Sequence, residues 1–311
     1  MPKAFGRGSC HTATVAQREW WVIGPMGQLG RELLEQAAPE GIALRAIPRA
    51  DLDLARPDTV RDFFSWGRVA LVINAAAWTD VDGAESQESR ARAVNADGVA
   101  ALAEACRHAG SHLIHVSTDY VFGGERPNRL PWAETDPLRP QGVYARTKAE
   151  GELAVREILP ERGTIVRTAW LYSGHGRNFV RTMLDKARAG EPASVVRDQW
   201  GQPTWARDVA TRILTLGERL ADGRAPAGIY HATNSGQTTW WEFARWIYSL
   251  ADADPGLVAP MASSDLNRPA PRPAWSVLGH GAWERAELPP LRPWREALVS
   301  AMPELDKTPG H

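Results

Sequence analysis

The sequence predicts an α/β fold in which helices cover both faces of a parallel sheet. Short apolar runs alternate with stretches that have helical spacing, and a glycine-rich turn follows the first apolar run. Strands that alternate with helices of this length pair in parallel through right-handed crossovers. We therefore expect a Rossmann-like, doubly wound parallel sheet, with a smaller C-terminal sub-domain that binds substrate.

The first unit of this sheet reads as a strand, a turn and a helix. Residues 20–23 are apolar, the turn runs from Gly24 to Gly30, and residues 31–37 follow as a helix. The later elements alternate in the same way: strand 42–47, helix 59–66, a buried strand 69–74, helix 88–109 and strand 112–117. In such sheets ligands bind beyond the carboxyl ends of the strands.

The composition excludes several classes of protein. With 36 Lys and Arg against 37 Asp and Glu, the formal charge of −1 gives no field that would attract nucleic acid or an anionic membrane. The longest apolar runs, such as residues 69–78, are much shorter than the ~20 residues that span a bilayer. Cys10 and Cys106 are too few for a disulfide framework, so we expect a reduced, cytoplasmic setting.

The glycine turn is a candidate binding site for the pyrophosphate of a dinucleotide. Gly24, Gly27 and Gly30 let the backbone come close to the phosphates, and the helix that follows Gln28 and Leu29 presents free N–H groups. The alternative is a tight strand-to-helix turn that binds no ligand.

The second strand bears on the choice of cofactor. It is followed by Pro48 and Arg49 and lacks the acid that would bind a ribose 2′-hydroxyl. Arg49 therefore favours a 2′-phosphate and NADPH, with NADH as the alternative, unless this arginine simply faces water. Asp53, before Leu54, either accepts from the adenine amine or caps the helix near Pro57.

Small and hydroxyl side chains follow the third and fourth strands. Ala75, Ala76 and Ala77 leave room for a dinucleotide, although close packing alone also explains them. Ser117 and Thr118 end the fourth strand and are suited to binding a carbonyl oxygen, or are ordinary turn residues.

Tyr144 and Lys148 are the most informative pair in the sequence. At i and i+4 of a helix they lie on one face and project toward one pocket. A nearby cation lowers the pKa of a phenol, which makes tyrosine usable as an acid. Together with the glycine turn, the pair predicts nicotinamide-dependent carbonyl chemistry.

Several motifs occur in the order found in one family. They are Gly24-x-x-Gly27-Gln28-Leu29-Gly30, Asn74-Ala75-Ala76-Ala77-x-Thr79-x-Val81-Asp82, Ser117-Thr118-Asp119-Tyr120-Val121-Phe122, Tyr144-x-x-Thr147-Lys148, Arg167-Thr168-Ala169-Trp170, Asn178-Phe179 and Arg272-Pro273. The chain resembles the dTDP-4-dehydrorhamnose reductases, within the extended short-chain dehydrogenase/reductases. The resemblance runs from about residue 20 to residue 302.

The resemblance implies reduction of the C4 ketone of a dTDP-4-keto-6-deoxyhexose by NADPH. Tyr144 would donate the proton, Lys148 would bind the nicotinamide ribose, and Thr118 would hold the ketone oxygen. The implied cofactor contacts are Gly24, Gly27, Gln28, Leu29, Gly30, Arg49, Asp53, Leu54, Ala75, Ala76, Ala77, Thr79, Tyr144 and Lys148. The implied substrate contacts are Thr79, Val81, Thr118, Asp119, Trp170, Asn178 and Arg272, although without the family Trp170 reads as a core residue.

The same comparison bears on domains, metal and assembly. We expect an NADP-binding domain over residues 19–170 with a return segment at about 206–234, a substrate-binding sub-domain mainly over 171–311, and a loosely ordered extension at 1–18. Some family members hold magnesium at a dimer interface with three carboxylates, but here only Glu32 is kept, and Arg207 and Arg295 align with the others. We therefore expect no metal, and either a homodimer or a monomer.

Two other functions fit parts of this pattern. A nucleotide-sugar epimerase or dehydratase keeps the Tyr and Lys pair but usually retains NAD. A non-catalytic regulatory subunit, of the type found with methionine adenosyltransferase, also binds the cofactor. Retained Thr118 and Trp170 argue against the second alternative.

Overall fold

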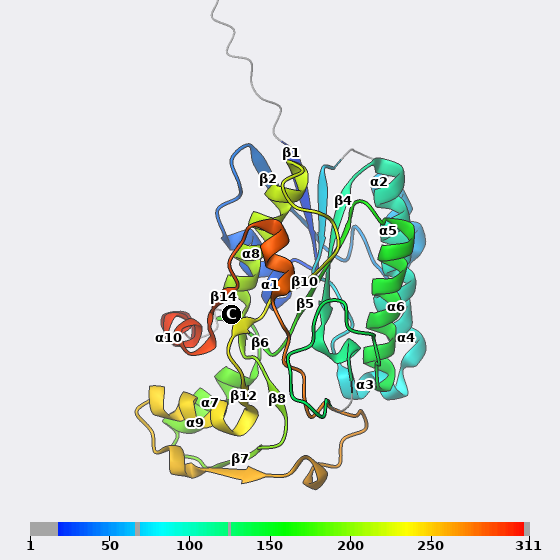
Figure 1. Cartoon of the computed structure of the whole chain (residues 1–311). Helices are drawn as coiled ribbons and strands as arrows, with labels where there is room; N and C mark the ends of the chain where they lie inside the picture. Colours follow the sequence, from blue (N-terminus) through cyan, green and yellow to red (C-terminus); the bar gives the residue numbers. More distant parts are fainter. Residues whose placement is uncertain (1–17, 66–68, 124–125, 308–311) are drawn as a thin grey trace, which may run out of the picture.

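The computed structural model describes residues 18–65, 69–123 and 126–307 (Figure 1). The expected loose extension at 1–18 therefore lies outside the described residues except for Arg18, and so does Trp66 at the expected end of a helix.

The centre of the protein is a six-stranded sheet in which all neighbouring strands are parallel. The strand order is β10-β5-β4-β3-β1-β2, with bounds β1 Arg18–Ile23, β2 Ile42–Ile47, β3 Leu71–Asn74, β4 His112–Thr118, β5 Gly163–Thr168 and β10 Ile229–His231. Because β1 lies between β2 and β3, the chain reverses its winding direction at β1, which is where doubly wound sheets bind ligands. The predicted α/β, Rossmann-like fold class is confirmed.

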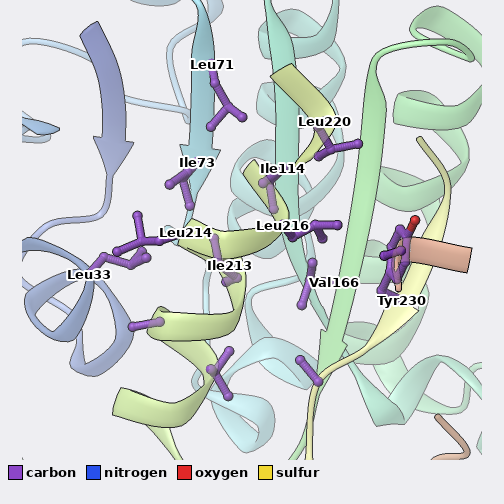
Figure 2. Packing of buried hydrophobic residues seen from close by; sticks show 14 of the residues in the cluster. Leu33, Leu71, Ile73, Ile114, Val166, Ile213, Leu214, Leu216, Leu220 and Tyr230 are labelled. Carbon is purple, nitrogen blue, oxygen red and sulfur yellow. The ribbon is translucent and has the colours of Figure 1, made fainter. Parts of the chain in front are cut away.

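Helices cover both faces of the sheet, as Figure 1 shows. On one face lie α1 (Gln28–Glu35) and α8 (Ala206–Ala221), and on the other α2 (Pro57–Phe64), α5 (Gly98–Ala109) and α6 (Gly142–Ile158). Figure 2 shows side chains of α8 packed against Ile73, Ile114 and Val166 of three neighbouring strands. No helix within the described ranges has the length and apolarity needed to span a bilayer.

The segment predicted as one helix over 88–109 is interrupted in the structure. It consists of α4 (Glu88–Arg92), a π-helical turn η1 (Ala93–Asp97) and α5. Buried Asn95 lies in this turn and holds the loop after β3, because its Oδ1 accepts from the Trp78 N–H at 2.8 Å and its Nδ2 donates to the Trp78 carbonyl at 3.2 Å. A π-turn of this kind often re-aims a side chain at a functional site.

The remaining elements build a second, smaller core. Aromatic and aliphatic residues of α7, α9 and α10 pack together there, among them Val180, Phe243 and Leu298. Figure 1 shows α7, α9 and β7 together beneath the sheet. The bounds are α3 Val81–Ser86, η2 Asp119–Val121, β6 Leu171–Tyr172, α7 Phe179–Arg188, β7 Ala193–Val196, β8 Trp200–Gly201, β9 Thr204–Trp205, β11 Asn234–Ser235, β12 Thr238–Thr239, α9 Trp240–Leu250, η3 Pro255–Leu257, β13 Val258–Met261, η4 Ser263–Asp265, η5 Gly281–Ala286, β14 Leu291–Pro293 and α10 Trp294–Leu305.

Candidate active site

A cavity of about 850 Å³ lies at the carboxyl ends of the strands and brings most of the predicted site residues together. Its lining includes Gly24, Gly27, Gln28, Leu29, Arg49, Asp53, Leu54, Ala75, Ala76, Ala77, Thr79, Val81, Thr118, Asp119, Tyr144, Lys148 and Trp170. Most of these residues follow strands of the sheet, and Trp240 of α9 comes from the smaller core, so both parts of the protein line the cavity.

The glycine turn after β1 is built for close backbone contact. Gly24 has φ +79°, and a Cβ there would lie 2.7 Å from the Ala76 nitrogen. A Cβ on Gly30 would lie 2.1 Å from the Gly24 carbonyl oxygen. Glycine is required at position 24 because φ is positive and the loop after β3 lies too close for a side chain. It is required at position 30 because α1 packs directly on the turn. Gly30 itself is not part of the cavity lining.

The N-terminus of α1 opens on this cavity. Gly27 is its N-cap residue, and no side chain caps the helix there. The first N–H groups of a helix have no intrahelical acceptor and carry a partial positive charge. This end of α1 therefore fits the pyrophosphate of a dinucleotide.

Arg49 and Asp53 lie at the edge of the cavity and pair with each other. Arg49 Nε is 3.1 Å from Asp53 Oδ2, and the arginine side chain is 78% exposed. Asp53 Oδ1 accepts from the Ala55 N–H at 3.0 Å, so this carboxylate has a local structural role. The exposed guanidinium retains donors that can meet a 2′-phosphate.

Thr118 is the last residue of β4, Asp119 follows it, and both are buried. The Thr118 hydroxyl donates to Asp119 Oδ1 at 3.0 Å. Burial raises the pKa of Asp119 to about 6, while Ser276 and Thr118 act to lower it. Within the described residues, Asp119 Oδ2 and Ser117 Oγ are buried without a hydrogen-bond partner. Unpaired polar atoms in the residues of a cavity wall fit a site that receives a polar ligand.

Tyr144 and Lys148 both line the cavity from one face of α6, as the sequence predicts. Burial raises the pKa of Tyr144 to about 12, a hydrogen bond with Thr118 acts to lower it, and Asp119 acts to raise it. The predicted lowering by Lys148 is not found: burial dominates, and Lys148 is not among the groups that shift the Tyr144 pKa. The raised pKa keeps Tyr144 protonated near neutral pH, as a proton donor must be.

Lys148 is held at a defined position rather than in solvent. Its Nζ donates to the Val116 carbonyl at 2.7 Å and lies 3.3 Å from His115 Nε2. The side chain is 2% exposed, and burial lowers the pKa of its amine to about 8, while Glu152 acts to raise it.

The start of α6 is fixed by a carboxylate from another helix. Gln141 provides no side-chain cap, and Glu85 of α3 instead accepts from the Val143 N–H at 2.7 Å. Gly142 precedes it with φ +77°, and a Cβ there would lie 2.7 Å from Glu85 Oε1. Glu85 therefore places the turn of helix that carries Tyr144.

Trp170 and Trp240 also line the cavity. Trp170 has φ +46°, a conformation that costs energy in a residue other than glycine. Its ring stacks on Trp240 with centroids 3.7 Å apart, and a Cβ on Gly201 would lie 2.4 Å from it. Trp170 is thus held between Gly201 and Trp240, with part of its surface in the cavity.

Two predicted substrate contacts lie elsewhere. Asn178 caps α7 by accepting from the Arg181 N–H at 3.1 Å, and Arg272 forms a bidentate pair with Asp82 at 2.8 and 2.9 Å. Neither belongs to the cavity lining. Their hydrogen bonds stabilise the surrounding loops.

Comparison with known proteins identifies the group to which the chain belongs. The family model described as "RmlD substrate binding domain" matches residues 19–307. The chain belongs to this dTDP-4-dehydrorhamnose reductase family. A Streptomyces griseus relative named dTDP-4-dehydrorhamnose reductase is 48% identical over 92% of this chain and 93% of its own.

Other members of the reductase family carry related names. A Streptomyces antibioticus relative, named a probable dTDP-4,6-dihydroxy-2-methyloxan-3-one 4-ketoreductase, is 46% identical over 92% of this chain and 95% of its own. The crystal structure of dTDP-4-dehydrorhamnose reductase from Bacillus anthracis in complex with NADP has a TM-score of 0.86 and 33% identity. It matches over 93% of this chain and 99% of that one.

The residues that align with the family's magnesium ligands do not form an all-oxygen site here. Arg207 Nε lies 3.0 Å from Glu32 Oε2, and Arg207 also pairs with Glu304. Arg207 therefore pairs with Glu32 within one chain. Arg295 instead stacks on Trp294 and Trp246.

Another group of side chains adjoins Glu32. Ligand atoms of Glu32, Glu35 and His175 lie within 4.8 Å of one another. Burial raises the pKa of Glu32, and Arg207 acts against this shift. An imidazole and a guanidinium at this place do not fit magnesium, which needs near-octahedral oxygen ligation.

The sequence patterns did not assign several cavity residues of this reductase family member to the site. Trp78, Tyr120 and Trp240 all line the cavity. The capping box formed by Thr239 and Glu242 marks the start of α9 in the sequence, but only the packing of α9 turns Trp240 toward the cavity.

Proposed function

We propose that this chain reduces the C4 ketone of a dTDP-4-keto-6-deoxyhexose with NADPH. The observation that carries the proposal is the meeting of Tyr144, Lys148 and Thr118 in one cavity with the uncapped start of α1. The names of the relatives support the same substrate class and reaction.

NADPH, when bound, supplies the hydride. Gly24 and Gly27 would admit its pyrophosphate to the start of α1, and Arg49 would meet the 2′-phosphate. Arg49 is exposed and held only by Asp53, so it can turn toward this phosphate. The alanines after β3 leave space beside the turn because they carry no side chain beyond Cβ.

The chain's own residues would complete the reduction. Thr118 would turn its hydroxyl from Asp119 to donate to the ketone oxygen, and Tyr144 would give its proton to that oxygen, so that addition of the hydride to carbon leaves an alcohol and a Tyr144 phenolate. Lys148 orients the ribose and stabilises the phenolate. Trp170 and Trp240 would bound the sugar.

The direct test is oxidation of NADPH, followed at 340 nm, with a freshly generated dTDP-4-keto-6-deoxyhexose and determination of the product's stereochemistry. Tyr144→Phe should lower kcat by at least ~10²–10⁴-fold, because it removes only the proton donor. Binding of NADPH should be nearly unchanged, since the ring and its packing remain.

Tyr230→Phe is a matched control, because this phenol of β10 is also buried but donates to the Pro226 carbonyl at 2.7 Å and does not line the cavity. It should retain most activity. If Tyr144→Phe keeps more than a tenth of the wild-type kcat, Tyr144 is not the proton donor.

A further inference from the structure

His115 lies in the middle of β4 with no exposed surface and joins two elements of the site. Its Nδ1 is 3.1 Å from Nδ2 of Asn74, the last residue of β3. Its Nε2 is 3.3 Å from Nζ of Lys148 on α6. The imidazole therefore connects the loop after β3 with the amine that lines the cavity.

The orientation of the Asn74 amide follows from its other partner. Asn74 Oδ1 accepts from the Ala76 backbone N–H at 3.1 Å. A backbone N–H can only donate, so the oxygen must face Ala76 and the NH₂ group must face His115. Asn74 thus donates to His115 Nδ1.

This hydrogen bond selects one tautomer of His115. Burial and the charge of Lys148 lower the pKa of His115 well below its ordinary value, so the ring is neutral. A neutral imidazole that accepts at Nδ1 carries its proton on Nε2. That proton points at Lys148 Nζ.

The tautomer in turn bears on the charge of Lys148. An ammonium group can only donate, so an Nε2–H directed at it places two donors against each other. A neutral amine can accept from Nε2–H with its lone pair while it donates to the Val116 carbonyl at 2.7 Å. The imidazole therefore favours the uncharged amine.

Other ionisable groups of the described residues face the site around Lys148. On α6, Glu152 favours the charged amine and acts against burial, while Tyr144 is neutral near pH 7. Asp119, at the end of β4, lies near Tyr144 and raises its pKa. Glu152 acts on Lys148 through its charge. His115 acts differently, because its tautomer decides whether Nε2 donates to Lys148 Nζ or accepts from it.

We propose that Asn74 and His115 are positioning residues. They hold Lys148 Nζ in place and let its amine gain and lose a proton within the pH range in which the enzyme is active. This inference rests on the proposed function, since it gives Lys148 its part in the reduction. The charged amine stabilises the Tyr144 phenolate, so activity should fall as pH rises through the Lys148 pKa.

Asn74→Asp tests the proposal by reversing the tautomer. A carboxylate can still accept from the Ala76 N–H, but it also accepts from His115, which must then carry its proton on Nδ1. His115 Nε2 becomes an acceptor for the ammonium of Lys148. The titration of Lys148 should therefore move upward by at least one pH unit.

The negative charge of the new aspartate would also raise the Lys148 pKa by itself. Comparison of His115→Phe with the double variant His115→Phe/Asn74→Asp separates the effect of charge from the effect of the tautomer. Phenylalanine has no ring nitrogen, so only the charge of the aspartate can act on Lys148. The rise in the Lys148 pKa caused by Asn74→Asp should be at least twofold smaller when His115 is replaced by Phe. Should Asn74→Asp not fold, His115→Gln serves instead, because its amide oxygen can accept from Lys148 and should also raise its pKa.

The measurement is NMR titration of ¹⁵N-lysine-labelled protein, which is tractable because the chain has four lysines, at positions 3, 148, 186 and 307. Loss of one signal in Lys148→Met assigns it. Titration of Lys148 near pH 8 in the wild type and a higher value in Asn74→Asp support the proposal. Titration above pH 10 in the wild type, or equal values in the two proteins, overturns it.

This readout needs neither cofactor nor substrate, so it is independent of the proposed reaction. If the NMR shift occurs and no dTDP-sugar is reduced, the proposed function fails and the Asn74–His115 inference stands. If ketone reduction occurs with an unchanged titration, the reverse holds. With an active enzyme, the alkaline limb of the kcat profile should move with the NMR pKa.

Discussion

The ion pair between Glu152 and Arg167 should be the most sensitive polar contact in the core. Glu152 lies on α6, one turn beyond Lys148, and Arg167 lies on β5. Both side chains are 1% exposed. Exchange of Glu152 for Gln keeps the shape of the side chain and removes its charge.

The magnitude follows from the contacts that the arginine makes. Arg167 donates to the carboxylate three times, at 2.9, 3.2 and 2.6 Å. Its other partners, the Glu134 carbonyl at 3.4 Å and His231 Nε2 at 3.2 Å, carry no compensating charge. Loss of one partner of a buried pair costs about 3–5 kcal/mol. At about 2–4 °C per kcal/mol, the melting temperature should fall by roughly 6–20 °C.

Differential scanning fluorimetry or calorimetry measures this change. Glu104→Gln is the matched control, because Glu104 pairs with Arg107 at 2.7 Å on the surface, where the side chains are 45% and 51% exposed. It should cost less than ~1 kcal/mol. A Glu152→Gln protein that melts within 2 °C of the wild type would refute the reasoning that the buried charge is compensated by Glu152.

Three further outcomes are expected. Arg49→Glu should shift the ratio of kcat/KM for NADPH and NADH toward NADH, because a carboxylate repels a 2′-phosphate and accepts from a 2′-hydroxyl; an unchanged ratio would mean that Arg49 only faces water. Burial raises the pKa of Asp119 from 3.8 to about 6, so the folded state binds the extra proton between these values and stability falls as pH rises through them. Asp119→Asn should therefore flatten the change in melting temperature between pH 4.5 and 7.5, and an equal slope in both proteins would contradict this origin. EDTA should alter neither the rate nor the elution volume in size-exclusion chromatography, since Arg207 already pairs with Glu32; loss that magnesium restores would disprove it.

Local sequence patterns predicted four of the six strands of the sheet, whereas β5 and β10 were not predicted. The strand at Ile42–Ile47 was predicted with its observed bounds, and β3 and β4 lie within two residues of theirs. An apolar run that ends at a turn carries this information in itself, even in the partly exposed edge strand β2. Helix starts were less accurate, because α1 begins inside the glycine turn at Gln28 rather than after it.

The cavity residues near the strand ends were also predictable. A glycine with positive φ and a Tyr and Lys pair four residues apart are short-range features, so the sequence shows them directly. The fold then brings Gly24, Thr118 and Tyr144 together because parallel strands end at one edge of the sheet.

Partners distant in sequence were decided only by the tertiary structure. Arg272 pairs with Asp82 across 190 residues, and Arg207 pairs with Glu32 across 175. The same holds for the imidazole that His115 places against Lys148. Sequence alone determined the fold class, the glycine turn and the Tyr144 and Lys148 pair, because backbone conformation and side-chain period are local. Charge pairing and tautomer depend on which side chains packing brings within about 3 Å of one another, and no local pattern records that.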